Sequence, residues 1–243
     1  MAVSAQEFND WLRSHGLPNG TSELSKLLGL NRATLNKQRL RGRVSETVVV
    51  ALARVAQMNP VTALGEFSQY REVPGGLKPP TDAELLSQMT YTDVMVELLR
   101  RSRADLAHRL AGYEMSQIPH DDAVRAWLDA VDPGDIRRQI AERTGIKPAN
   151  LSALLTENRL PPEVAVAAAE LAGTSSASGL VVTGLVTPEE AGWPLYCREN
   201  SFDRMDDLAL IDATEAKLKQ LRRATKKKMD TEATVQNFWE TLG

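Results

Sequence analysis

Residues 21–35 read TSELSKLLGLNRATL, and this stretch decides the fold. Its apolar residues recur at helical spacing on both sides of a central glycine and do not alternate as they would in a strand. The pattern predicts one helix over residues 21–28, a tight turn over residues 29–31 and a second helix over residues 32–40. Helices joined by so short a turn must cross at close range.

Five residues of this stretch meet the packing demands of two crossing helices. Leu24 and Leu35 are spaced to bury between the helices, and Ser25 is small at the crossing point. Gly29 ends the first helix where a left-handed backbone is needed, which glycine adopts without steric cost. We expect Leu30 to fill the corner between the helices.

Further short helices are predicted on either side of this pair. One covers residues 6–14. Ser45 is expected to cap a fourth helix that runs to residue 57. Pro60 suits the first turn of a fifth helix, which ends near residue 68. Residues 1–73 are therefore expected to form one domain of five helices.

This five-helix segment resembles the helix-turn-helix domain of the lambda-repressor-like family of DNA-binding proteins. The resemblance covers about 65 residues and rests on the five residues described above. One position departs from the family pattern. Three residues after Leu35 the family usually has an apolar residue, and this chain has Gln38, which leaves the end of the third helix open.

In this family the third helix enters the major groove of DNA, with its N-terminal residues facing the base edges. Arginine pairs with guanine and asparagine with adenine, while alanine can contact the thymine methyl group. The resemblance implies base-reading positions at Asn31, Arg32, Ala33, Asn36 and Lys37. It also implies phosphate contacts from Thr21, Ser22, Arg39, Arg41 and Arg43.

The charge distribution favours this interpretation, although the whole chain has a net charge of -3. Residues 1–75 hold nine Lys and Arg against six Asp and Glu, whereas residues 120–195 hold six against eleven. The positive surplus thus coincides with the predicted reading helix, and a local patch matters more than the total. The alternative is a solvated basic face on a structural helical bundle.

The chain matches itself at an offset of 116 residues. Eleven identities occur without a gap over residues 11–57, among them Trp11 with Trp127 and Gly29 with Gly145. Amphipathic patterning alone does not demand these residue types. We therefore expect a tandem duplication, with convergent helical patterning as the alternative.

The second copy is expected over residues 120–196, with its third helix over residues 148–156. It keeps the core positions of the first copy on a less basic surface. Its candidate DNA contacts are Lys147, Ala149, Asn150, Ser152, Ala153, Asn158 and Arg159. Two interpretations stay open: this copy binds DNA, or it is a degenerate copy that serves as a scaffold or partner surface.

The region between the copies, residues 74–119, is predicted to contain a linker and a long helix. Residues 74–80 are rich in proline and glycine and cannot continue a helix. Thr81 and Glu84 fit a capping box, which opens a helix expected over residues 82–112 with a heptad seam. The seam either packs on its own domain or forms a homodimer.

The C-terminal region, residues 197–243, is predicted to be a helical tail. A helix is expected to start at residues 187–190, and two more over residues 205–228 and 231–242. The last helix carries an apolar face that docks on its own domain or forms a homodimer or partner contact: Val235, Phe238, Trp239 and Leu242. Residues 217–228 hold seven positive residues, which either clamp phosphates or form a solvated face.

Several classes of site find no support in the sequence. The single cysteine, Cys197, cannot form an internal disulfide. The three histidines are far apart, which argues against a zinc site, and no phosphate-binding glycine loop is present. No apolar run is long enough to cross a membrane. We expect no enzyme activity, no cofactor and no metal, and a cytosolic location.

The sequence therefore predicts an all-α protein with two tandem lambda-repressor-like domains and a C-terminal helical tail. We expect a transcriptional repressor that binds double-stranded operator DNA in the bacterial cytosol, in association with the nucleoid. The two-domain chain resembles the immunity repressors of temperate actinobacterial phages, and its two unlike readers imply an asymmetric site. The alternatives are an antitoxin-like interaction protein and an accessory factor that targets a DNA-processing enzyme.

Overall fold

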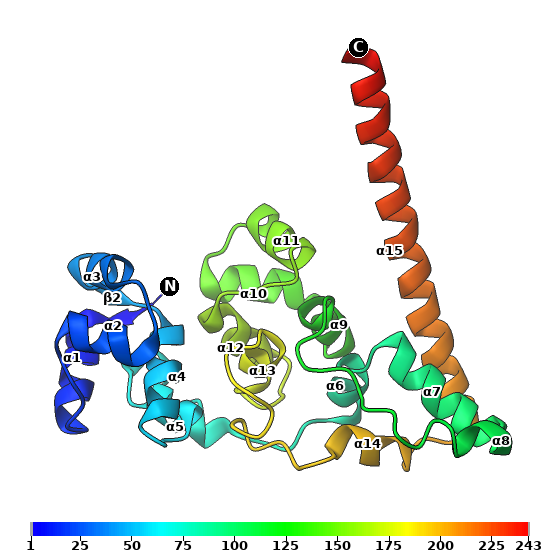
Figure 1. Cartoon of the computed structure of the whole chain (residues 1–243), viewed down its shortest axis with the longest axis horizontal. Helices are drawn as coiled ribbons and strands as arrows, with labels where there is room; N and C mark the ends of the chain where they lie inside the picture. Colours follow the sequence, from blue (N-terminus) through cyan, green and yellow to red (C-terminus); the bar gives the residue numbers. More distant parts are fainter. Residues whose placement is uncertain (1, 243) are drawn as a thin grey trace. The chain divides into compact units, whose positions relative to one another are not determined.

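The computed structural model describes the backbone of residues 2–242 and the side chains of these residues except 227 and 234–242. Over this range the protein is all-α apart from one two-stranded sheet. The chain divides into two compact units, and neither is continuous in sequence. The first comprises Met1–Gln88 and Ile118–Leu195, and the second Met89–Gln117 and Tyr196–Gly243. Figure 1 shows the elements in chain order.

The N-terminal segment of the first unit contains the five helices predicted there. They are α1 (Ala5–Ser14), α2 (Thr21–Leu28), α3 (Arg32–Leu40), α4 (Glu46–Val55) and α5 (Pro60–Gly65), followed by the 3-10 turns η1 (Ser68–Tyr70) and η2 (Pro74–Gly76). Side chains cap four of them, since Ser4, Asn31, Ser45 and Asn59 each accept a hydrogen bond from a first-turn N–H. Helix α4 ends two residues earlier than predicted because Gln57 adopts a positive φ of 55°.

A short antiparallel sheet joins the start of this segment to the residues after α3. Strand β1 (Val3–Ser4) pairs with β2 (Arg43–Val44), with Val3 opposite Val44. Both valines are fully buried, and Ser4 then caps α1. The sheet, which the sequence analysis did not predict, fixes the chain directly beyond the end of α3.

The second segment of the first unit follows the same order of helices. Within residues 118–195 its elements are α9 (Ala123–Ala130), α10 (Ile136–Thr144), α11 (Pro148–Thr156), α12 (Pro162–Leu171) and α13 (Ser178–Val182). Helix α6 (Asp82–Ser87), at the end of the first stretch of this unit, packs on α9. Helices α11 and α12 begin and end 116 residues after α3 and α4. Gly29 and Gly145 both adopt left-handed backbones, with φ of 63° and 70°.

Each segment encloses its own apolar core. Trp11 and Trp127 are both buried, as are Leu35 and Leu151 at the centres of α3 and α11. Around Trp127 the buried cluster draws on α9, α10, α11 and α12. Corresponding positions in the two segments therefore occupy corresponding places in their cores.

The prediction of one helix over residues 82–112 is wrong. The region forms three helices, namely α6, α7 (Tyr91–Ser102) and α8 (Ala104–Ala107). Thr81 and Glu84 do form the predicted capping box at α6, but Thr90 and Asp93 form a second one that starts α7. Because the chain restarts at Thr90, the heptad seam is interrupted, and no continuous helix presents it to a second copy.

The second unit consists of α7, α8, α14 (Cys197–Phe202) and α15 (Asp207–Leu242). The two helices predicted over 205–228 and 231–242 are one uninterrupted helix (Figure 1). Its N-terminal part packs on α7 and buries Leu210 and Ala213. The predicted face of Val235, Phe238, Trp239 and Leu242 lies outside the described side chains.

Residues 187–190 form a turn where a helix was expected. Thr187 and Glu190 exchange the hydrogen bonds of a capping box, but the chain turns again at Gly192, which has a positive φ of 77°.

Among the described residues, no helix is both long and apolar enough to cross a membrane.

Candidate nucleic-acid interface

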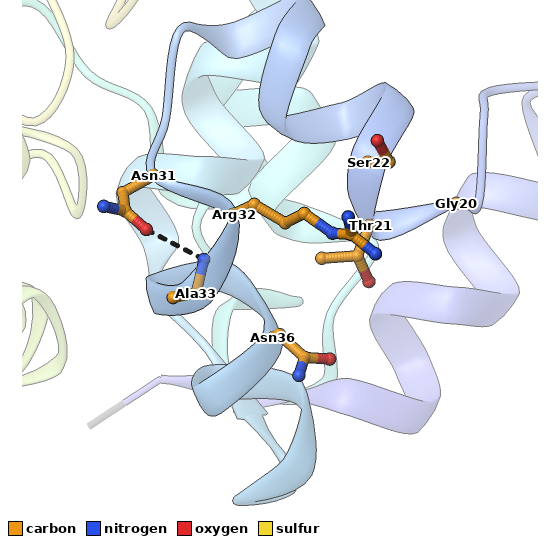
Figure 2. A pocket seen from close by; sticks show the side chains of 7 residues that line it. All are labelled: Gly20, Thr21, Ser22, Asn31, Arg32, Ala33 and Asn36. Atoms are coloured by element: carbon orange, nitrogen blue, oxygen red, sulfur yellow. Dashed lines mark hydrogen bonds between the residues drawn. The ribbon is translucent and has the colours of Figure 1, made fainter.

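An open cleft of about 810 Å³ lies between the N-terminal ends of α2 and α3 (Figure 2). Seven residues line it, and six of them are predicted DNA contacts: Gly20, Thr21, Ser22, Asn31, Arg32, Ala33 and Asn36. The two helix ends are brought together by the turn at Gly29. The structure thus gathers most of the predicted N-terminal contacts on one surface.

The start of α2 offers donors to this cleft. Gly20 is the N-cap and has no side chain to satisfy the first-turn N–H groups. The N-terminal end of a helix attracts anions through these groups and through the helix dipole. Thr21 and Ser22 add hydroxyl groups at the same place, an arrangement suited to a phosphate.

The start of α3 offers side chains that can reach base edges. Asn31 Oδ1 accepts a hydrogen bond from the Ala33 N–H at 2.8 Å, so this oxygen is used to cap the helix. Arg32 and Asn36 project from α3 without such a constraint (Figure 2), and Lys37 follows them on the exposed surface. Both the arginine and the asparagine are suited to two-point hydrogen bonding with bases.

Arg39 is half-buried and makes hydrogen bonds within the domain. Its Nη1 donates to the backbone oxygen of Asn19 at 2.7 Å and to Thr21 Oγ1 at 3.3 Å, while Nη2 donates to the side chains of Asn9 and Asn19. Burial lowers the pKa of Arg39. The guanidinium therefore ties α3 to α1 and to the start of α2.

Gln38 has a hydrogen-bond partner within the domain. Its Oε1 accepts a hydrogen bond from the Ser45 N–H at 3.0 Å. The side chain thus bonds the end of α3 to the residue that caps α4. Helix α3 nevertheless ends at Leu40, as predicted.

Arg41 and Arg43, for which phosphate contacts are predicted, are both exposed after α3. Arg41 is the C-cap residue of α3, and Arg43 lies on β2. Leu30 does not fill the corner, since 39% of it is exposed. The buried residues of these two helices are Leu24, Ser25 and Leu35.

The second segment presents fewer free polar groups. Lys147, Asn150 and Ser152 are exposed at the start of α11, beside the exposed Ala149 and Ala153. Asn158 faces inward: its Nδ2 donates to the His120 oxygen at 3.0 Å and its Oδ1 accepts from the Val124 N–H at 2.9 Å.

Arg159 also has an internal partner, because it forms an ion pair with Glu157. Of the predicted contacts, Asn158 and Arg159 are thus engaged within the segment itself.

The two segments differ in how they hold one pair of corresponding helix positions. Arg39 corresponds to Leu155 at the offset of 116, and Leu155 is buried in the core of the second segment. The same helix position is therefore held by polar contacts in one segment and by apolar packing in the other. The polar contacts of Arg39 include the side chains of Asn9 and Asn19, which were not predicted from the sequence.

The described part of the chain contains no group of three or more His, Cys, Asp or Glu residues arranged to hold a metal ion. Comparison of the chain with protein-family models, with curated proteins and with solved structures finds no match. The case for a function therefore depends on the geometry of the site.

Proposed function

We propose that the protein is a sequence-specific repressor that binds double-stranded DNA and reads the major groove with α3. The observation that carries this proposal is the cleft between the starts of α2 and α3. It combines helix N–H groups that no side chain caps, and two hydroxyls, with an exposed arginine and asparagine. The first set suits a phosphate and the second suits base edges, and duplex DNA presents both.

The chemistry divides into two roles. Thr21 and Ser22 would hold the DNA backbone and set the register of the protein along it, with Arg41 and Arg43 contributing charge. Arg32, Asn36 and Lys37 would then discriminate between bases. The resemblance to immunity repressors of temperate phages gives the proposed biological role, control of transcription from an operator, and it is a resemblance only.

The second segment bears on the shape of the DNA site. It offers Lys147, Asn150 and Ser152 at the place that corresponds to the reading positions of α3. These residues differ from their counterparts, so a site bound by both segments of one chain would be asymmetric. Its acidic surroundings support the competing view, that it is a scaffold or partner surface.

Selection of bound duplexes from a random-sequence library tests the proposal. We expect the intact protein to enrich one sequence motif, and the double variant Arg32→Ala/Lys37→Ala to lose it. The matched control is Arg13→Ala/Lys26→Ala, which removes the same charges from exposed positions outside the cleft. If the intact protein enriches no motif, sequence-specific binding is ruled out.

A third variant, Lys147→Ala/Asn150→Ala, decides the role of the second segment. Loss of preference over one part of an asymmetric motif would assign that part to α11. An unchanged motif would assign all base reading to α3 and leave the second segment as a scaffold or partner surface.

A further inference from the structure

Helix α15 extends well beyond its contact with α7. Its 36 residues correspond to a length of about 54 Å. Leu210, Ala213 and Thr214 are buried, but every described side chain from Leu218 to Ala233 is exposed. Beyond its contact with α7, the helix is therefore solvent-exposed along its described side chains.

Four cations line one face of the exposed stretch. They are Lys219, Arg222, Arg223 and Lys226, at spacings of three, four and seven residues from the first. Residues at these spacings share one face of a helix. Leu218 and Leu221 fall outside this set and are each more than a third exposed.

Most of this charge is uncompensated. Lys219 pairs with Glu215 at 3.0 Å, and both side chains are largely exposed. Among the described residues, no carboxylate pairs with Arg222, Arg223 or Lys226. Like charges three or four residues apart destabilise a helix, so this face gains stability from any anionic partner.

We propose that the face formed by Lys219, Arg222, Arg223 and Lys226, here called the basic face, binds the phosphate backbone of double-stranded DNA. This inference rests on the proposed function, because it adds a sequence-independent contact to the DNA that α3 reads. The basic face extends about 10 Å along the helix, and duplex DNA carries one phosphate charge per about 1.7 Å of its axis. A row of phosphates can therefore engage all four cations at once.

A symmetric contact between the basic faces of two copies does not suit this face, because it would set cations against cations. Duplex DNA supplies the complementary charge at high density and requires no apolar surface. The basic face would strengthen binding to every sequence equally and leave the choice of sequence to α3.

The test is a salt titration of full-length protein on two duplexes, the selected motif and a scrambled control, followed by fluorescence anisotropy. The variant is Arg222→Gln/Arg223→Gln/Lys226→Gln. The matched control, Arg100→Gln/Arg103→Gln/Arg109→Gln, removes three exposed arginines from the same unit. We expect the variant to reduce the slope of log affinity against log salt by between about 2 and 3 on both duplexes, with the preference for the motif unchanged. The control should keep the wild-type slope.

Three results would overturn the inference. One is an unchanged slope in the variant, and another is an equal loss in the control, which would show an effect of net charge alone. The third is wild-type binding to anionic phospholipid vesicles that the variant loses while its DNA slope stays constant. Failure of the proposed function looks different, since the protein would then show no preference for any motif whatever its slope.

Discussion

The Arg54 guanidinium and the Glu190 carboxylate form a two-point ion pair, with Nε 2.7 Å from Oε1 and Nη2 2.8 Å from Oε2. Arg54 lies in the last turn of α4, and Glu190 lies in the turn that follows α13. The Asn59 side-chain amide donates to the Glu190 backbone oxygen at 2.9 Å. This pair therefore fastens the N-terminal segment of the first unit to the end of its second segment.

Replacing Glu190 tests how much this ion pair contributes to the free energy of unfolding. Glu190→Gln keeps an acceptor for the Thr187 N–H but loses the charge that pairs with Arg54. Because the pair is partly exposed, we expect the free energy of unfolding to fall by only about 0.5–1 kcal/mol, measured by urea denaturation. Glu189→Gln, at an exposed neighbouring position, should have no effect. Equal losses in the two variants would contradict a specific role for the pair.

The same pair predicts a dependence of stability on pH. The hydrogen bond from Arg54 lowers the pKa of Glu190 in the folded state, against the opposing effect of burial. The stabilisation is therefore complete at pH values above the unfolded pKa of about 4.3 and is lost as the pH falls through the lower folded value. The stability difference between wild type and Glu190→Gln should shrink over that window. A difference that stays constant on acidification would show that the carboxylate charge is not the cause.

Gly29→Ala should weaken the turn between α2 and α3. Gly29 has a φ of 63°, and an added Cβ would meet no atom within 4 Å, so backbone strain alone sets the cost. We expect a loss of about 1 kcal/mol in stability. Gly75→Ala also adds a Cβ to open space, but its φ is outside the left-handed region, so it serves as the control. A thermal midpoint of Gly29→Ala equal to that of Gly75→Ala would show that the turn tolerates a side chain.

Arg39→Ala should lower the stability of the protein, whereas Arg41→Ala should affect only its binding to DNA. Arg39→Ala removes the donors that serve Asn9 and Asn19, so we expect a stability loss of about 1–3 kcal/mol and weaker binding to every duplex. Arg41→Ala should leave stability unchanged and reduce the salt slope of DNA binding by about 1. If Arg39→Ala is as stable as wild type yet loses about one unit of slope, Arg39 contacts phosphate after all.

Asp93→Asn should destabilise the second unit. Asp93 is 2% exposed, and its carboxylate accepts hydrogen bonds from Thr90, Tyr113 and Ser116. Burial alone would raise the pKa of Asp93, but these hydrogen bonds lower it overall. Asparagine has one acceptor oxygen in place of two, so we expect a loss of about 1–3 kcal/mol by thermal denaturation. The exposed Asp105→Asn is the control, and a loss no larger than its own would contradict the prediction.

Local signals in the sequence were sufficient to predict several helix starts. Ser45 and Thr81 cap the helices expected of them, because a cap is a contact between residues two or three positions apart. The start at Thr90 obeys the same rule, with Asp93 three residues later. It was missed because a heptad pattern running through it favoured one continuous helix.

Contacts between residues far apart in the sequence limited how much of the candidate site could be predicted. Arg39 was assigned to phosphate because its partners Asn9 and Asn19 are thirty and twenty residues away, and nothing local shows that they meet it. For Asn158, the sequence does contain a local indication of its structural role. It corresponds to Gly42 at the offset of 116, and both adopt positive φ, 51° and 72°. A position held by glycine in one copy and asparagine in the other indicates a turn more than a DNA contact.

The hydrogen bond from the Ser45 N–H to Gln38 links the end of α3 to the start of α4. Helix α4 is about 15 Å long, with the end of α3 bonded near its start and Arg54 holding the second segment near its end. If α3 binds DNA as proposed, a tilt of α3 is transmitted along α4 toward Glu190. Amides of α4 should then gain protection from hydrogen exchange when DNA is added.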